Sequence, residues 1–231
     1  VVDHAVVPSL IKMLKSEDTS MMIPALRSLG NIVSGSDVQT QAVLDAGLLD
    51  ACLVLLQVPK KTIRKETCWS VSNIAAGTSA QLDQLMERED ILSLVLSEMS
   101  SGAEWDVRKE AVWVLSNAAT AAKGPHLLTL LRLGALKPIC ECMVDVRDSK
   151  ALMCCLEALE AFLKLNLERA DIDVLTTLDE CGGIEALENL QEHENDEVYQ
   201  KAVELIETYC NDEEDEGENL VPEVGANNQF S

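Results

Sequence analysis

The feature that most constrains this chain is a segment that recurs at intervals of about forty residues. Residues 24–32, PALRSLGNI, return at 66–74 as ETCWSVSNI and again at 110–118 as EAVWVLSNA. The first interval is 42 residues long and the second is 44 residues long. Intervals of this size are typical of armadillo and HEAT arrays, whose helical repeats bury their apolar faces only against neighbouring repeats. The sequence therefore predicts a solenoid.

Each repeat is predicted to hold two short helices and one longer helix. Glycine splits the short amphipathic segments, as in 43–49, VLDAGLL, and in 130–136, LLRLGAL. The predicted fold class is an all-α, right-handed superhelical armadillo-repeat solenoid of about five three-helix repeats. The predicted boundaries are 1–36 for a partial first repeat, then 37–78, 79–122, 123–170 and 171–210, followed by a disordered acidic tail at 211–231. Because the chain does not begin with methionine, we expect a fragment of a longer protein.

Composition supports helix and excludes several classes of partner. Aromatic residues make up 3% of the chain and hydrophobic residues 47%, which disfavours an all-β domain. The formal net charge of −22 argues against nucleic acid and against an anionic membrane surface, and no apolar run has the length of a membrane span. Two interpretations of this acidity remain open: it serves solubility alone, or it creates an electrostatic field that attracts cationic ligands.

Signatures of catalysis, metal binding and cofactor binding are absent from the sequence. The eight cysteines contain no CxxC pair, which indicates buried thiols in a reducing compartment. The three histidines are far apart, and there is no phosphate-binding glycine loop, nucleophile elbow or paired-carboxylate motif. We therefore predict a protein that is not an enzyme and carries no metal or cofactor.

Two of the longer helices carry glutamate, tryptophan and asparagine at positions i, i+3 and i+7, which form one column on a helix face. The columns are Glu66, Trp69 and Asn73 in one repeat, and Glu110, Trp113 and Asn117 in the next. An asparagine amide can pair with the N–H and C=O of an extended peptide. A tryptophan offers an apolar wall and a π-face to a Lys or Arg side chain, and the glutamate can meet its cationic head.

The spacing of the columns also suits an extended ligand. Helices of neighbouring repeats lie roughly 10 Å apart, and an extended strand rises about 3.3 Å per residue. Successive asparagines would then meet every second or third residue of a bound peptide.

A single tryptophan or asparagine on a helix more often serves the core or bridges helices than forms a site. Two complete columns at the solenoid interval favour a site. The array fades on both sides, because the first repeat keeps Asn31 but has Arg27 in the tryptophan position, and the fourth has Glu157 and Ala161. Trp105, near a predicted helix start, is interpreted as a packing residue.

Several runs together resemble the importin-α (karyopherin-α) family, the adaptors that carry nuclear localisation signals. The runs are 24–35, 37–47, 63–77, 107–119, 180–184, 190–195 and 199–202. The resemblance covers nearly all of residues 1–210. It implies a fragment holding the C-terminal armadillo repeats, from the sixth to the tenth.

The resemblance also implies a site and partners. The two columns would form the family's minor signal-binding site, with Ser72 beside them and with Val33, Gly35 and Thr40 at further positions of that site. Expected partners are basic nuclear localisation signal peptides of cargo proteins, and an export receptor and nucleoporins at the last repeats. Importin-β would bind an N-terminal segment that this sequence does not include. Shuttling between cytoplasm and nucleus is the expected localisation. The alternative is a general armadillo scaffold that binds folded protein partners.

Overall fold

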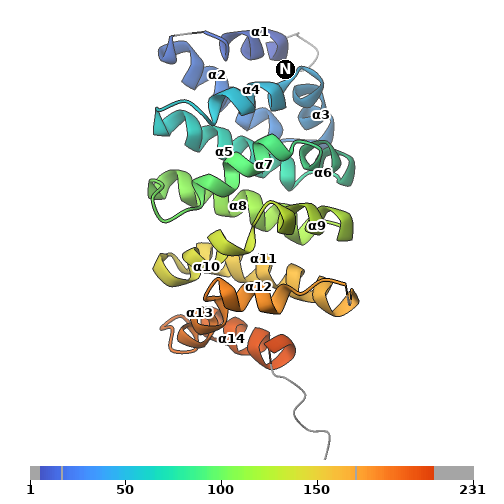
Figure 1. Cartoon of the computed structure of the whole chain (residues 1–231). Helices are drawn as coiled ribbons and strands as arrows, with labels where there is room; N and C mark the ends of the chain where they lie inside the picture. Colours follow the sequence, from blue (N-terminus) through green and yellow to red (C-terminus); the bar gives the residue numbers. More distant parts are fainter. Residues whose placement is uncertain (1–5, 17, 170, 211–231) are drawn as a thin grey trace, which may run out of the picture.

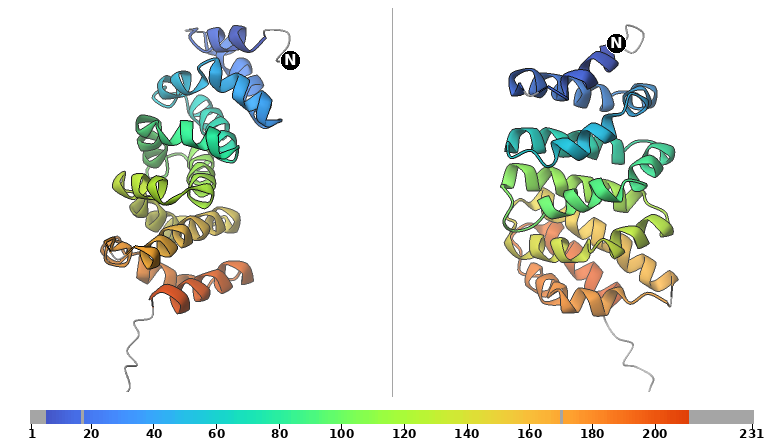
Figure 2. Two further views of the ribbon diagram at one scale, coloured as in Figure 1. Left: turned by 90° about the vertical axis from the view of Figure 1, so that its right-hand side faces the viewer. Right: turned by 45° about the horizontal axis from the view of Figure 1, so that its top comes forward.

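The structure is a computed structural model that describes residues 6–16, 18–169 and 171–210. Within these ranges the chain forms fourteen α-helices and one π-helix, and no strand is present. The predicted all-α solenoid is confirmed, and the repeats follow one another in chain order along one axis (Figures 1 and 2). The acidic tail predicted at 211–231 lies outside the described residues.

The helices group in threes after an incomplete first repeat. That first repeat holds α1 (Val6–Met13) and α2 (Thr19–Val33). The next three repeats hold α3 (Asp37–Asp45), α4 (Leu48–Leu55) and α5 (Lys61–Ala75); α6 (Ser79–Met86), α7 (Glu89–Glu98) and α8 (Trp105–Ala121); and α9 (Gly124–Arg132), α10 (Leu136–Asp145) and α11 (Ser149–Glu168). The last repeat holds α12 (Val174–Glu180), α13 (Gly183–Leu190) and α14 (Asp196–Leu205), followed by a π-helix at Ile206–Cys210.

Glycine marks the turn between the two short helices, as the sequence predicted. Gly47 has φ +92° between α3 and α4, and Gly134 has φ +82° between α9 and α10. L-residues with a side chain rarely adopt this left-handed conformation. In the described part of the chain no single helix is long and apolar enough to span a membrane, although α3 and α4 taken together, with a 71° bend between them, are.

Glutamine at the start of α6 joins two neighbouring repeats. Thr78 precedes the helix, and its backbone N–H donates to Gln81 Oε1 at 3.0 Å. Gln81 Nε2 then donates to the backbone carbonyl of Asp37 in the preceding repeat at 2.8 Å. One buried side chain therefore caps its own helix and fixes the neighbouring repeat.

The long third helices form a continuous layer through the molecule. Helices α2, α5, α8, α11 and α14 pack in succession, each on the next, and we call them the third-helix layer. The apolar residues of α5 and α8 that face the core include five that are 2% exposed or less: Val71, Ile74, Val112, Leu115 and Ala118. Because these positions fill the core, the Glu–Trp–Asn columns lie on a different face of the same helices.

Ion pairs cross from one repeat to the next along the whole stack. They include Arg64–Glu98 at 2.7 Å, Arg88–Asp50 at 2.8 Å, Lys109–Asp148 at 2.5 Å and Lys201–Glu160 at 2.8 Å. Many of the 18 lysines and arginines are thus paired with carboxylates inside the fold. Because the chain has 40 aspartates and glutamates, a large excess of negative charge is left without a cation. The surface therefore carries a strongly negative field.

Candidate functional site

A shallow hollow of about 280 Å³ lies on the third-helix layer where α2, α5 and α8 meet. Its lining comes from three consecutive repeats: Arg27, Asn31, Lys65, Glu66, Trp69 and Glu110. Five of these six residues were singled out from the sequence, and the structure brings them together. Lys65 was not, although it directly precedes the first column.

The Trp69 indole, half-buried, lies directly over Gly30 of α2. A methyl group built on Gly30 would stand 2.3 Å from Trp69 Cζ3 and 2.7 Å from Cε3, far inside contact distance. The absence of a side chain at Gly30 is what lets the ring settle against the preceding repeat. Trp69 thus forms a fixed wall of the hollow, and Trp113 is similarly half-buried on α8.

The two column asparagines have different hydrogen-bond partners. Asn117 Nδ2 donates to both the backbone carbonyl and the Oγ of Ser72, each at 3.1 Å. Asn73 Nδ2 is shielded from solvent and has no hydrogen-bond partner among the described residues. A buried donor left without an acceptor costs about 1–3 kcal/mol. A ligand carbonyl oxygen would remove that cost only if the Asn73 amide turned to bring this buried donor to the surface.

The two column glutamates also differ. Glu66 is buried and forms an ion pair with Arg27 of the preceding repeat, and this bond raises the pKa of Arg27. From the sequence we expected Glu66 to be available to a ligand cation, but its carboxylate is already paired with Arg27. The reason is the stacking of the repeats, which brings Arg27 of α2 alongside Glu66 of α5.

Glu110 is half-buried and, within the described residues, forms no ion pair closer than 4.0 Å. Burial raises the pKa of its carboxyl above the ordinary value; Lys65 opposes this shift, and Glu66 adds to it. A carboxylate that is desolvated without full compensation gains from an arriving cation. Glu110 is therefore the column's available anion.

Other predicted positions lie deeper than expected. Val33 and Thr40 are each 3% exposed, and Thr40 Oγ1 donates to the Val33 carbonyl at 3.0 Å. Both residues belong to the buried junction of α2 and α3 and offer almost no surface to a ligand. Gly35 is exposed in the turn between these helices, and Ser72 is buried as the acceptor of Asn117.

The arginine that precedes each column by two residues serves the fold. Arg64 pairs with Glu98, and Arg108 is buried with Nε 2.6 Å from the Met99 carbonyl and Nη2 2.8 Å from Asp145. The same sequence position thus fastens each repeat to the next. Arginine recurs at this position, in residues 64–66 and 108–110 (both RKE), because of this structural role.

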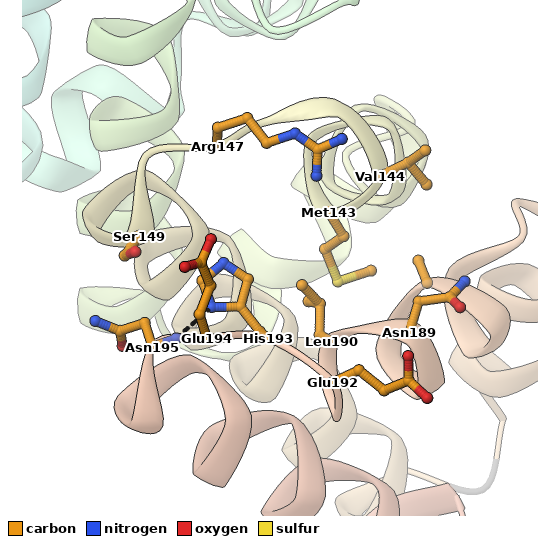
Figure 3. Close-up of a pocket in the computed structure, with 11 residues that line it drawn as sticks. Met143, Val144, Arg147, Ser149, Asn189, Leu190, Glu192, His193, Glu194 and Asn195 are labelled. Atoms are coloured by element: carbon orange, nitrogen blue, oxygen red, sulfur yellow. Dashed lines mark hydrogen bonds between the residues drawn. The ribbon is translucent and has the colours of Figure 1, made fainter.

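Further hollows lie away from the columns. One of about 690 Å³ is formed by the α10–α11 and α13–α14 connections, with Arg147 on one side and His193 on the other (Figure 3). His193 Nδ1 accepts the backbone N–H of Asn195 at 3.0 Å. Trp105, which we expected to be packed, is 40% exposed at the start of α8 and lines a separate hollow of about 410 Å³. Among the described residues no group of His, Cys, Asp or Glu could hold a metal ion.

Comparison with protein families identifies armadillo repeats at two places. The family described as "Armadillo/beta-catenin-like repeat" matches residues 36–76, and the family described as "Atypical Arm repeat" matches residues 173–223. Among solved structures, a designed armadillo repeat protein in complex with the peptide (KR)4 is 27% identical, with a TM-score of 0.78 over 90% of this chain and 83% of that one. A computationally designed armadillo repeat protein for modular peptide recognition has a TM-score of 0.79 at 25% identity, over 89% of this chain and 83% of that one.

Curated relatives give the more specific assignment. Importin subunit alpha-1b of Oryza sativa subsp. japonica is 40% identical over 94% of this chain and 41% of its own length. Importin subunit alpha-3 of Arabidopsis thaliana is 41% identical over 97% of this chain and 44% of its own length. The chain spans about two fifths of the length of these relatives. Taken with the repeats and the solenoid, these similarities show that the chain belongs to the importin-α family of armadillo-repeat proteins.

Proposed function

We propose that the chain is part of a nuclear import adaptor and binds extended Lys/Arg-rich nuclear localisation signals along the columns of α5 and α8. The observation that carries the proposal is the repeated Glu–Trp–Asn column, which faces away from the core on two successive third helices. The names of the curated relatives support it. The designed neighbour in complex with (KR)4 supports the ligand class.

Backbone recognition is assigned to the asparagines. The Asn73 amide, whose Nδ2 is buried without a partner, would turn on binding and donate to a peptide carbonyl. Asn117 is already oriented by its two bonds to Ser72, which hold its amide in place before a ligand arrives. Such recognition is independent of the peptide's side chains and fixes its direction.

Side-chain recognition is assigned to the tryptophans and to Glu110. Trp69 is held against Gly30, so a Lys or Arg stem can pack on a wall that does not have to reorganise. Glu110 offers a carboxylate close to Trp69 in the same hollow. The net charge of −22 raises the local concentration of cationic peptides, an effect that salt screens.

Other contacts of the proposed adaptor follow from the family resemblance. We propose that the last repeats contact an export receptor and nucleoporins, and that importin-β binds a segment outside this sequence. The proposed adaptor shuttles between cytoplasm and nucleus.

The test is a titration of a fluorescent Lys/Arg-rich peptide, followed by anisotropy at low and at physiological salt. Each tryptophan is expected to contribute about 0.5–2 kcal/mol, so the Trp69→Ala/Trp113→Ala double variant should bind at least about fivefold more weakly. Trp105→Ala is the matched control, because Trp105 lines a different hollow. Circular dichroism should remain helical for both variants.

Unchanged peptide affinity in the folded double variant would refute the site. If in addition the chain recovers only folded proteins in a pulldown, and a basic peptide does not compete, the alternative of a general armadillo scaffold is favoured.

A further inference from the structure

Two cysteines from adjacent repeats meet at the junction of the last two repeats. Cys140 lies in α10, and Cys181 follows α12 at its turn into α13. Lys137, three residues before Cys140 on α10, lines the same hollow as Cys181, so the two cysteines lie on facing surfaces of these elements. Cys140 Sγ is pressed against this turn, since a methyl group built on Gly183 would stand 2.8 Å from it. The packing of α10 on α12 and α13 therefore brings the two thiols close together.

The two thiols differ in their access to solvent. Cys140 is 2% exposed, whereas Cys181 is partly exposed and lines a hollow of about 160 Å³. Apolar side chains form much of this hollow, with Lys137 and Asp173 at its polar edge. Burial, with the neighbouring Cys181 next in effect, raises the pKa of Cys140 to about 12. A small oxidant thus meets Cys181 first, with a protonated thiol directly behind it.

The chain contains a second pair of cysteines for comparison. Cys142 of α10 lies beside Cys155 of α11, and Arg108 Nη2 stands 3.3 Å from Cys142 Sγ. The neighbouring Cys155 is the largest effect that lowers the pKa of Cys142, and Arg108 adds to it. Both sulfur atoms lie in the core, with exposures of 0% and 1%. The lowered pKa of Cys142 favours oxidation of the 142–155 pair, whereas access to solvent favours oxidation at Cys181.

We propose that Cys181 and Cys140 form a peroxide-oxidised modification site, whose disulfide fastens the last repeat to the preceding one. In the first step the Cys181 thiolate attacks a peroxide oxygen, the O–O bond breaks, and Cys181 becomes a sulfenic acid as hydroxide leaves. In the second step Cys140 sulfur attacks Cys181 sulfur, and the Cys140 proton leaves with the hydroxyl as water. Two thiols are oxidised, and one hydrogen peroxide is reduced to two waters. A thiol reductant converts the disulfide back to two thiols.

The experiment uses the whole chain, reduced and then treated with hydrogen peroxide in small molar excess. Free thiols are blocked at successive times, and the digest is read by mass spectrometry. We expect a 140–181 cross-link, lighter by two hydrogens, to form before any 142–155 cross-link and to disappear with dithiothreitol. Cys140→Ser should accumulate the Cys181 sulfenic acid, which a dimedone probe traps. Cys210→Ser removes the other partly exposed thiol and should leave the cross-link unchanged.

The wild-type time course decides the proposal even if a variant folds poorly. A 142–155 cross-link that forms first would overturn it, because thiolate character would then outweigh access. Disulfide-linked dimers through Cys181, or overoxidation of Cys181 without a cross-link, would overturn it as well. As a second readout, the oxidised chain should melt several degrees higher than the reduced chain, and the difference should vanish on reduction. An oxidised chain that melts at or below the reduced one would contradict the proposed fastening of the last repeat.

Discussion

Gly30 controls the position of the Trp69 ring and therefore offers a sharp test of the site. In Gly30→Ala, the new methyl group would overlap the indole, whose nearest atoms lie 2.3 and 2.7 Å from it. A rigid ring cannot yield by rotating one terminal atom, so the whole indole must move away from α2. The substitution changes the binding wall without deleting any of its atoms.

Two opposing effects set the change in stability. Alanine is favoured over glycine in a helix interior by roughly 1 kcal/mol, and overpacking costs about 1–3 kcal/mol. The net destabilisation is therefore between about zero and 2 kcal/mol. Loss of a well-placed wall for a Lys or Arg side chain costs about 0.5–2 kcal/mol of binding. Peptide affinity should accordingly fall by about 2- to 30-fold.

Urea denaturation measures the first quantity, and peptide anisotropy measures the second. Near-ultraviolet circular dichroism reports displacement of the indole. Gly102→Ala is the matched control, because a methyl group built on Gly102 meets nothing within 4 Å. The reasoning fails if Gly30→Ala is folded, has a displaced indole and still binds the basic peptide as tightly as wild type.

Two more predictions concern the charges of the hollow. Arg27→Ala should strengthen binding of a basic peptide several-fold at low salt, because Glu66 loses its internal cation; the gain should shrink at high salt. Weaker binding at both salt concentrations, measured by anisotropy, would show that Arg27 instead holds Glu66 in a binding geometry. Affinity should also fall as the pH drops through the raised pKa of Glu110, since its neutral acid form attracts no cation. Glu110→Gln should flatten this part of the pH profile, and an identical profile in that variant would exclude Glu110.

The repeat structure was predictable because its signals are local. Helix periodicity, the glycines of the short turns and the 42- and 44-residue intervals depend on the chain's own order. The column geometry was predictable for the same reason, since i, i+3 and i+7 share a face in any helix. Gly47 and Gly134 could be placed at turns without knowledge of the stacking.

Contacts between repeats were not predictable, because they depend on the angle and offset at which helices stack. The ion pair of Glu66 with Arg27 joins residues on separate helices, and no spacing rule within one helix announces it. The same holds for the buried position of Thr40 and for the approach of Lys65 to the hollow. The approach of Cys140 to Cys181 likewise arises only when the last repeat packs on the preceding one.

The ion pairs that cross from repeat to repeat have a mechanical consequence. Each pair connects two neighbouring repeats, so together the pairs resist bending of the solenoid at the interfaces between repeats. Because partly exposed pairs weaken as salt screens them, these interfaces soften as ionic strength rises. The bending stiffness of the solenoid therefore depends on the ionic strength of the solvent as well as on the sequence. The distance between Asn73 and Asn117 should fluctuate more as the ionic strength rises.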